Sequence, residues 1–353
     1  MKSLDILEKY KNLVYPEVKK SLTNPDFPKA FETPKKFKSL EEFHWQVIKE
    51  YPERQGKYLR PTLLILTGQS LGVPLKKMLK TAVAMQLSED WLLIHDDFED
   101  KSILRRGKPT LNILFGDELA VNAGDALHAL MWKVIFDNVP ILGFEKTQKI
   151  LNEFFMTLAR TTLGQTAEIK WAREKITNFD NDDWYFIADG KTSYYTIACP
   201  MRLAAIIADR DEKELEKLAE FGLYLGRCFQ LTDDILDITS DFQGKKEFAN
   251  DIYEGKKTVL LAHLFEKLKY KPKEREKLEE ILLKPRDKKS EEEVLWVIGL
   301  MRRWKAIEYA KKLAEENKKK AKKFFVQELK FLSHEPYRSQ LESLIDFILE
   351  RKS

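Results

Sequence analysis

The sequence predicts an all-α protein, a single large helical bundle, and three observations carry this prediction. The 353 residues include only 14 glycines and 13 prolines, the two residues that most disfavour helix interiors. Apolar residues recur at helical spacing along the chain. No sustained strand-type alternation, fixed-period repeat or low-complexity linker interrupts that pattern. We therefore expect one domain over residues 1–353.

The expected helices follow one another with short breaks. Residues 1–22 have an amphipathic pattern and precede a polar stretch that contains prolines. An apolar helix over 59–71 ends at the Gly72–Pro74 stop signal, and a long helix over 75–100 follows it. A polar Gly-Pro break over 105–109 comes next. The other expected helices are 39–51, 116–138, 143–171, 181–190, 191–208, 212–239, 256–269, 274–284, 290–332 and 337–351.

Composition excludes several classes of protein. The net charge is only +4, from 61 basic and 57 acidic residues, which argues against a nucleic-acid binder. No apolar run of eighteen residues is present, so we expect no membrane span, and the N-terminus lacks a signal-peptide core. Cys199 and Cys228 lie in apolar helical stretches and suggest no disulfide framework. We expect a cytoplasmic protein.

Two acidic clusters of the form D-D-x-x-D follow apolar helical runs. Residues four apart share one face of a helix, so the first and last carboxylates of each cluster point the same way. Like charges at that spacing destabilise a helix, and a cation between them reverses the effect. Mg²⁺ typically takes one or two carboxylates and completes its shell with water and substrate phosphate. A solvated acidic turn would explain one cluster, but two copies indicate metal binding. The clusters are Asp96, Asp97 and Asp100, and Asp233, Asp234 and Asp237.

Basic residues accompany the aspartates. Arg105 and Arg106 are adjacent, and guanidinium groups bind phosphate oxygens in bidentate fashion. Lys57 and Arg60 place two cations at the start of a helix, and Lys191 stands beside a run of hydroxyl residues. Each of these groups alone is compatible with a solvated surface. Carboxylate pairs for Mg²⁺, cations for phosphate and apolar helix faces together indicate a diphosphate ester of a hydrocarbon as substrate.

At this point the sequence resembles the trans-isoprenyl diphosphate synthases of the polyprenyl synthetase family, which includes farnesyl and geranylgeranyl diphosphate synthases. The matching segments are GKYLRP, LLIHDDFEDKSILRRGKPT, LGQTAE, GKTSYY, FQLTDDILD and EGKKT. They occur in the family's order and cover nearly the whole chain. The resemblance implies an isoprenoid synthase type I fold, in which the helical bundle surrounds a central cavity. It also implies a homodimer and a short-chain prenyltransferase. Its substrates would be isopentenyl diphosphate and a C5, C10 or C15 allylic diphosphate.

The resemblance implies three Mg²⁺ ions in each active site. Two of these ions would bind Asp96 and Asp100 and bridge the allylic diphosphate, and the third would bind Asp233. The remaining carboxylates of the two clusters would support them through water or hydrogen bonds. These are Asp97, Asp234 and Asp237.

The resemblance also assigns the cations to two diphosphate groups. The residues implied to grip the allylic diphosphate are Arg105, Lys191, Lys256 and Lys246, with Lys245 as the alternative to Lys246. The residues implied to hold the diphosphate of isopentenyl diphosphate are Lys57, Arg60 and Arg106.

Four further side chains are assigned by the same resemblance. Thr192 and Gln230 would direct oxygen dipoles at the developing carbocation, and such preorganised stabilisation is usually the largest catalytic contribution. Gln165 matches a family glutamine that faces the cavity. Trp91 stands five residues before Asp96, where a large aromatic side chain in the family limits product length. We expect the C20 product, geranylgeranyl diphosphate, with C15 farnesyl diphosphate as the alternative; an ordinary core role for Trp91 stays open.

The sequence departs from the family pattern at two positions. Glu89 occupies a place at the isopentenyl diphosphate site that usually holds His or Gln. A carboxylate there repels a diphosphate unless it is protonated or paired with Lys57 or Arg60. Glu168 replaces a common Asp. A class I terpene cyclase normally lacks the second D-D-x-x-D, and non-catalytic subunits of heteromeric synthases commonly lose one cluster, so the two intact clusters favour a synthase.

Overall fold

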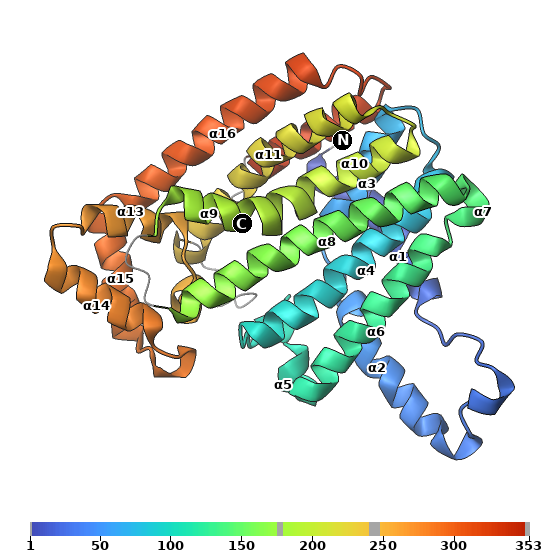
Figure 1. Cartoon of the computed structure of the whole chain (residues 1–353), viewed down its shortest axis with the longest axis horizontal. Coiled ribbons are helices and arrows are strands. Elements are labelled where there is room, and N and C mark those ends of the chain that lie inside the picture. Colours follow the sequence, from blue (N-terminus) through green and yellow to red (C-terminus); the bar gives the residue numbers. More distant parts are fainter. Residues whose placement is uncertain (1, 175–178, 240–247, 350–353) are drawn as a thin grey trace. The chain divides into compact units, whose positions relative to one another are not determined.

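The structure is a computed structural model that describes residues 2–174, 179–239 and 248–349. Its described part is helical apart from one short hairpin (Figure 1), so the expected all-α class is confirmed. Contacts within the chain group it into two compact units, and we describe each by itself. The first unit comprises 1–152, 203–210 and 334–341; the second comprises 153–202, 211–333 and 342–353. The single domain expected from the sequence remains a prediction.

The first unit contains the elements of the N-terminal half of the chain. Its α-helices are α1 (Ser3–Ser21), α2 (Lys38–Arg54), α3 (Leu59–Ser70), α4 (Leu75–Glu99), α5 (Leu111–Phe115), α6 (Asp117–Phe136) and α7 (Val139–Leu142). Two short 3₁₀ turns, η1 (Lys29–Phe31) and η2 (Lys35–Phe37), lie in the proline-containing stretch before α2. The strands are β1 (Leu104–Arg105) and β2 (Lys108–Pro109).

Helix α4 is the centre of this unit. It is buried over the whole of residues 81–91, because α1, α3 and α6 pack against it; Figure 1 shows α6 running beside it. A helix buried all round is expected to be apolar all round. The carboxylates of Glu89 and Asp90 within this stretch are therefore exceptional and require partners. The first aspartate cluster stands where α4 ends.

The expected polar break after α4 is a short β-hairpin, whose strands were not predicted. Leu104 pairs with Pro109 and Arg105 with Lys108, and residues 106 and 107 form the loop. Their φ angles are +54° and +76°, as a type I′ turn requires. Strands of two residues are too short to show alternation in a sequence. The turn matters for the site because it sets the direction of the Arg106 side chain.

The second unit contains the rest of the chain. Three helices are divided between the two units: α8 (Phe144–Arg173) and α17 (Tyr337–Leu349) begin in the first unit and end in the second, and α10 (Cys199–Ile207) begins in the second and ends in the first. The elements that lie wholly in the second unit are α9 (Asn181–Ala188), the π-helix η3 (Asp189–Ala198), α11 (Glu212–Thr239), α12 (Asn250–Glu254), α13 (Val259–Lys267), α14 (Pro272–Leu283), the 3₁₀ turn η4 (Arg286–Lys288), α15 (Glu291–Arg303) and α16 (Ala306–Glu328). In Figure 1, α16 lies beside α11, and the two are in contact.

The π-helix η3 positions the chemistry of this unit. The expected helices 181–190 and 191–208 are not separated by a break, since α9 continues through η3 into α10. Single π-helical turns occur frequently at functional sites. Helix α11 approaches η3 very closely at Gly226, where an added Cβ would lie 2.3 Å from the Ser193 Cα. Only glycine permits this approach, and the approach brings Thr192 within hydrogen-bond reach of α11.

The expectation of one helix over 290–332 is wrong. The chain turns after Trp304, and Lys305 has a φ angle of +56° before α16 begins. Both resulting helices contribute to one apolar core with α13, through residues such as Val297 and Ala306. Tertiary packing overrides the helix propensity of this Lys- and Glu-rich segment. Among the helices that the structure describes, none is long and apolar enough to cross a membrane.

Candidate active site

The first aspartate cluster separates into one carboxylate held by the protein and two at the helix end. Asp97 is fully buried and lies 3.0 Å from the Arg105 Nε through each of its oxygens, and the Tyr51 hydroxyl also donates to it. Asp96 and Asp100 are only half-buried, and Asp100 caps α4. Arg105 reaches Asp96 at 3.7 Å. Asp97 therefore orients Arg105, while Asp96 and Asp100 keep access to a ligand.

A second group of charges lies seven residues earlier on α4. Glu89 forms ion pairs with Arg60 at 3.0 Å and with Arg106 at 3.2 Å. Arg106 also lies 3.7 Å from Asp90, whose side chain is fully buried. Burial raises the pKa of Asp90 to about 7. Lys57 is exposed just before α3. The structure thus brings Arg60 and Arg106 together as the sequence predicts, with a carboxylate between them.

Trp91 belongs to a cluster of aromatic rings between α4 and α6. Its ring lies 4.5 Å from that of His128 and 5.6 Å from that of His95. Trp132 donates its indole N–H to the His128 Nε2 at 2.8 Å. Burial lowers the pKa of His128, which favours the neutral ring that this hydrogen bond requires. The side chain of Trp91 is therefore held from α6 as well as by its own helix.

A chain of hydrogen bonds surrounds the middle aspartate of the second cluster. Trp184 donates its indole N–H to Asp234 at 2.9 Å, and Gln230 donates its amide N–H to the other carboxylate oxygen at 2.8 Å. The Thr192 hydroxyl donates to the amide oxygen of Gln230 at 2.6 Å. Burial raises the pKa of Asp234 to about 7. The structure thus joins Thr192 and Gln230, the two residues expected to stabilise a carbocation.

The outer aspartates of the second cluster differ in exposure. Asp233 is half-buried on α11. Asp237 is fully buried and accepts a hydrogen bond from the backbone N–H of Asp251 at 3.0 Å. This contact ties the end of α11 to the start of α12. Asp233 is therefore the member of this cluster that retains access to a ligand.

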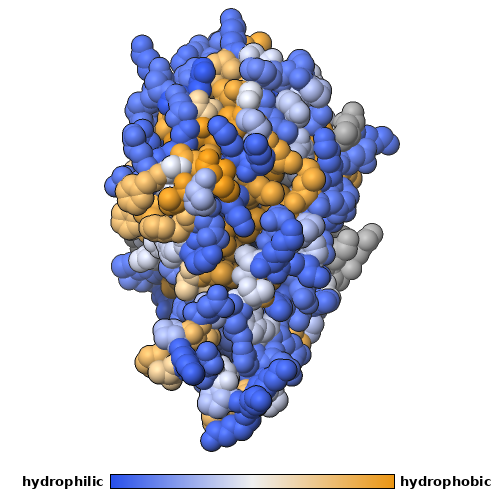
Figure 2. All heavy atoms as spheres, turned by 90° about the vertical axis from the view of Figure 1, so that its right-hand side faces the viewer, coloured by the Kyte–Doolittle hydropathy of each residue, from blue (hydrophilic) through white to orange (hydrophobic). Residues whose placement is uncertain are grey.

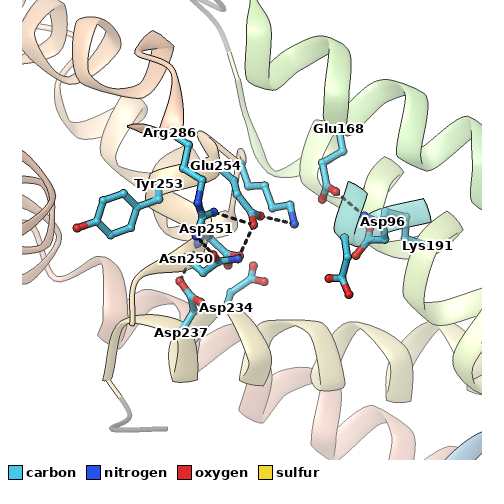
Figure 3. A network of polar contacts seen from close by, with 12 residues as sticks. Asp96, Glu168, Lys191, Asp234, Asp237, Asn250, Asp251, Tyr253, Glu254 and Arg286 are labelled. Atoms are coloured by element: carbon cyan, nitrogen blue, oxygen red, sulfur yellow. Dashed lines mark hydrogen bonds and ion pairs between the residues drawn. The ribbon is translucent and has the colours of Figure 1, made fainter. Parts of the chain in front are cut away.

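Helix α8 supplies partners for η3. Lys191 forms an ion pair with Glu168, the residue that departs from the family pattern (Figure 3). Gln165 lies half-buried three residues earlier on α8, so it shares that helix face. Lys246 and its alternative Lys245 lie outside the described residues. Of the predicted lysines in this part of the chain, Lys191 and Lys256 have described positions.

Lys256 belongs to a polar network around Glu254. Figure 3 shows Glu254 beside Arg286. The carboxylate of Glu254 lies 2.6 Å from the Lys256 Nζ and 3.2 Å from the Arg286 Nη1. Arg286 also donates to the Asn250 side chain at 2.8 Å. The carboxylate of Glu254 is almost fully buried. It therefore fixes Lys256 at the start of the segment that leads into α13.

The donors present suit Mg²⁺. Within the described ranges, no three His, Cys, Asp or Glu side chains converge on one point. Mg²⁺ does not require such a cage, because it takes one or two carboxylates and keeps water and phosphate as its other ligands. Asp96, Asp100 and Asp233 provide hard oxygen donors that are not fully buried. These residues fit the ion expected from the sequence.

Several residues that hold the site were missed in the sequence. Tyr51 and Trp184 donate to the buried aspartates, and Glu254 and Arg286 fix Lys256. Each partner is distant along the chain from the residue that it holds, apart from Glu254. No local spacing could reveal such contacts, because packing of separate helices creates them.

Comparison with known proteins identifies the family. A family model described as polyprenyl synthetase matches residues 41–301. The chain belongs to the polyprenyl synthetase family. Its expected class, a prenyltransferase, is thereby confirmed. The family match runs from within α2 to within α15 and includes both aspartate clusters.

Named relatives of this synthetase include two archaeal enzymes. The geranylgeranyl diphosphate synthase of Saccharolobus solfataricus is 31% identical over 226 residues, which is 64% of this chain and 66% of that protein. The geranylgeranyl pyrophosphate synthase of Geoglobus acetivorans is 28% identical over 310 residues, covering 87% and 90% of the two chains. The crystal structure of geranylgeranyl pyrophosphate synthetase from Pyrococcus horikoshii matches with a TM-score of 0.82 at 24% identity, over 99% and 98% of the chains. That likeness confirms the fold.

Proposed function

We propose that this synthetase condenses an allylic diphosphate with isopentenyl diphosphate and releases inorganic pyrophosphate. The observation that carries the proposal is the shared construction of the two aspartate clusters. In each, the middle carboxylate is buried and hydrogen-bonded to the protein, whereas another carboxylate remains half-buried beside it. A solvated acidic turn would not need a buried carboxylate with dedicated donors.

The proposed metal ligands are the accessible carboxylates Asp96, Asp100 and Asp233, for three Mg²⁺ ions. Magnesium, when bound, neutralises the charge that develops on the departing diphosphate. The buried Asp97, Asp234 and Asp237 position neighbouring groups. The cations proposed to bind the allylic diphosphate are Arg105, Lys191, Lys246 and Lys256. Those proposed for the diphosphate of isopentenyl diphosphate are Lys57, Arg60 and Arg106.

Thr192 and Gln230 are proposed to stabilise the allylic carbocation. The carboxylate of Asp234 accepts the Gln230 amide N–H, which leaves the amide oxygen on the side of Thr192. Both groups therefore keep oxygen lone pairs that are oriented before the reaction, and fixed dipoles of this kind need no reorganisation. The double bond of isopentenyl diphosphate attacks the cation, and the proton lost afterwards passes to the released pyrophosphate. No side-chain base is required.

Trp91 is proposed to limit the length of the product to C20, with C15 as the alternative. The support is its burial against His128, which Trp132 holds in turn. A tryptophan whose ring packs against a second helix is disfavoured from changing its rotamer, because its ring would lose these contacts.

A homodimer and a cytoplasmic location belong to the same proposal. Figure 2 shows hydrophobic side chains gathered among hydrophilic ones on one face of the molecule. Exposed large hydrophobic residues include Phe136 at the end of α6 and Phe144 at the start of α8, the latter 64% exposed. A contiguous apolar patch is typical of a surface that a partner covers. Light scattering in solution would give the mass of the assembly.

A product assay tests the reaction. The purified protein would be incubated with Mg²⁺, isopentenyl diphosphate and, separately, C5, C10 and C15 allylic diphosphates, and the products separated by chain length. We expect elongation to C20 or C15 that EDTA abolishes. Release of pyrophosphate with cyclic hydrocarbons would instead indicate a terpene cyclase, and complete inertness would indicate a non-catalytic subunit.

A further inference from the structure

Glu89 occupies the position between two guanidinium groups that a phosphate would otherwise take. One of its carboxylate oxygens lies 3.0 Å from the Arg60 Nη1 and the other 3.2 Å from the Arg106 Nη2. The two arginines come from different elements, α3 and the turn of the hairpin. A carboxylate that bridges two guanidiniums uses the same donors with which arginine binds phosphate.

The surroundings hold Glu89 in this position. Its side chain is only 12% exposed. The backbone at Gly56 covers it, since an added Cβ there would lie 2.6 Å from the Arg106 Nη2 and 3.4 Å from the Glu89 Oε1. Asp90 lies beside it, fully buried, and Tyr58 is buried close by. A carboxylate in such surroundings is stabilised by its ion pairs and leaves them only when another anion replaces it.

The charge of this group is low for a diphosphate site. Arg60, Arg106 and the exposed Lys57 contribute three positive charges. The negative charge of Glu89 offsets one of these positive charges, and the carboxylate of Asp90 lies 3.7 Å from the Arg106 guanidinium. Because the energy of a charged ligand scales with its own charge, a negative side chain here penalises a diphosphate more than a monophosphate.

We propose that Glu89 is a specificity-determining residue that competes with isopentenyl diphosphate, the second substrate, for Arg60 and Arg106. It thereby weakens the binding of isopentenyl diphosphate. It also reduces the difference in affinity between a diphosphate and a monophosphate. This inference rests on the proposed function, which assigns the two arginines to isopentenyl diphosphate. Binding of that substrate exchanges one anion for another at the guanidiniums. Glu89 takes no part in the chemical step.

The test compares Glu89→Gln with the parent enzyme. Glutamine keeps the size of the side chain and one oxygen acceptor but removes the charge. We expect the KM for isopentenyl diphosphate to fall about tenfold, which corresponds to about 1.4 kcal/mol, with the KM for the allylic diphosphate unchanged. In titration calorimetry, isopentenyl diphosphate should gain more affinity than isopentenyl monophosphate.

Two further variants serve as controls. Glu89→Asp keeps the charge and should retain the weak binding of the parent. Glu145→Gln removes one negative charge from an exposed i,i+4 pair with Lys149 and should leave both KM values unchanged. The Glu145 side chain is 85% exposed, so this variant measures the effect of net charge alone.

The outcomes separate this inference from the proposed function. A parent enzyme that elongates no allylic starter contradicts the proposed function itself. An active parent whose KM for isopentenyl diphosphate is the same or lower than that of Glu89→Gln overturns the inference. A lower melting temperature with unchanged KM would show that the ion pairs of Glu89 serve stability alone, and would overturn it too.

Discussion

Replacing Trp184 by phenylalanine removes one hydrogen bond from Asp234 and keeps an aromatic ring in place. The indole N–H lies 2.9 Å from a carboxylate that is 3% exposed. A hydrogen bond to a charged group contributes about 1.5–3 kcal/mol. At roughly 2.1 cal/mol/K per residue, a chain of this length has an unfolding entropy near 0.7 kcal/mol/K, so the melting temperature should fall by about 2–4 °C.

The same substitution should reduce the rate. The indole N–H lowers the pKa of Asp234, and burial already raises that pKa to about 7. Without Trp184, more Asp234 is protonated at neutral pH, and a protonated carboxyl no longer has to accept from Gln230. The amide of Gln230 then loses its fixed orientation toward Thr192. We expect kcat to fall about tenfold, which is less than the loss of about 10²–10³ for complete removal of one stabilising dipole, because the Gln230 dipole is misoriented and not removed.

Trp304→Phe is the matched control. Its indole N–H is buried but has no hydrogen-bond partner among the residues that the structure describes. Removing it should leave the melting temperature within about 1 °C and kcat unchanged. Thermal unfolding and steady-state elongation rates would be measured on both variants. Equal effects of Trp184→Phe and Trp304→Phe, or an unchanged kcat in Trp184→Phe, would refute the role assigned to the Asp234 hydrogen bonds.

Three other predictions follow from single contacts. Trp91→Ala should lengthen the product beyond C20 in the product assay, and an unchanged product would exclude Trp91 as the limit. Arg202→Met should lower the free energy of unfolding by about 3–5 kcal/mol in denaturant titration, because the buried carboxylate of Glu153, 2.8 Å from the Arg202 Nε, loses its cation. Adding Glu153→Leu should recover most of this loss. No recovery in the double variant would contradict the ion-pair explanation. The pKa of Asp90 is about 7 in the folded chain against 3.8 for an ordinary aspartate, so the folded state binds a proton that the unfolded state has lost. The free energy of unfolding is therefore highest below pH ~4 and falls as the pH rises from there through 7, by up to about 4 kcal/mol relative to Asp90→Asn. Parallel curves of stability against pH for the two proteins would disprove this.

Much of the fold could be predicted because the signals are local. The scarcity of glycine and proline and the apolar periodicity predict most helices within a few residues, as for α4 and α8. The break between α15 and α16 could not be predicted, because Trp304 and Lys305 are no stop signal and the turn there serves packing around α13. The hairpin before α5 was missed because its two-residue strands are shorter than any pattern that a sequence shows.

The site divides in the same way. Spacing alone could predict that Asp96 and Asp100 share a helix face. It could not predict which carboxylates are buried, because burial of Asp97 depends on Tyr51 of another helix. The pairing of Glu89 with Arg60 was one of the possibilities that the sequence left open, and only the packing of α3 against α4 decides it.

Five of the cations proposed to bind phosphate form ion pairs with carboxylates in this structure. Arg105 pairs with Asp97, Arg60 and Arg106 with Glu89, Lys191 with Glu168, and Lys256 with Glu254. Paired charges cancel at a distance, so these groups add little to the long-range field that would otherwise steer an anion to the protein. The encounter with substrate is then governed by diffusion and fit. Other polyanions in the cell are attracted little at long range, and only a ligand that fits the paired cations at close range remains bound.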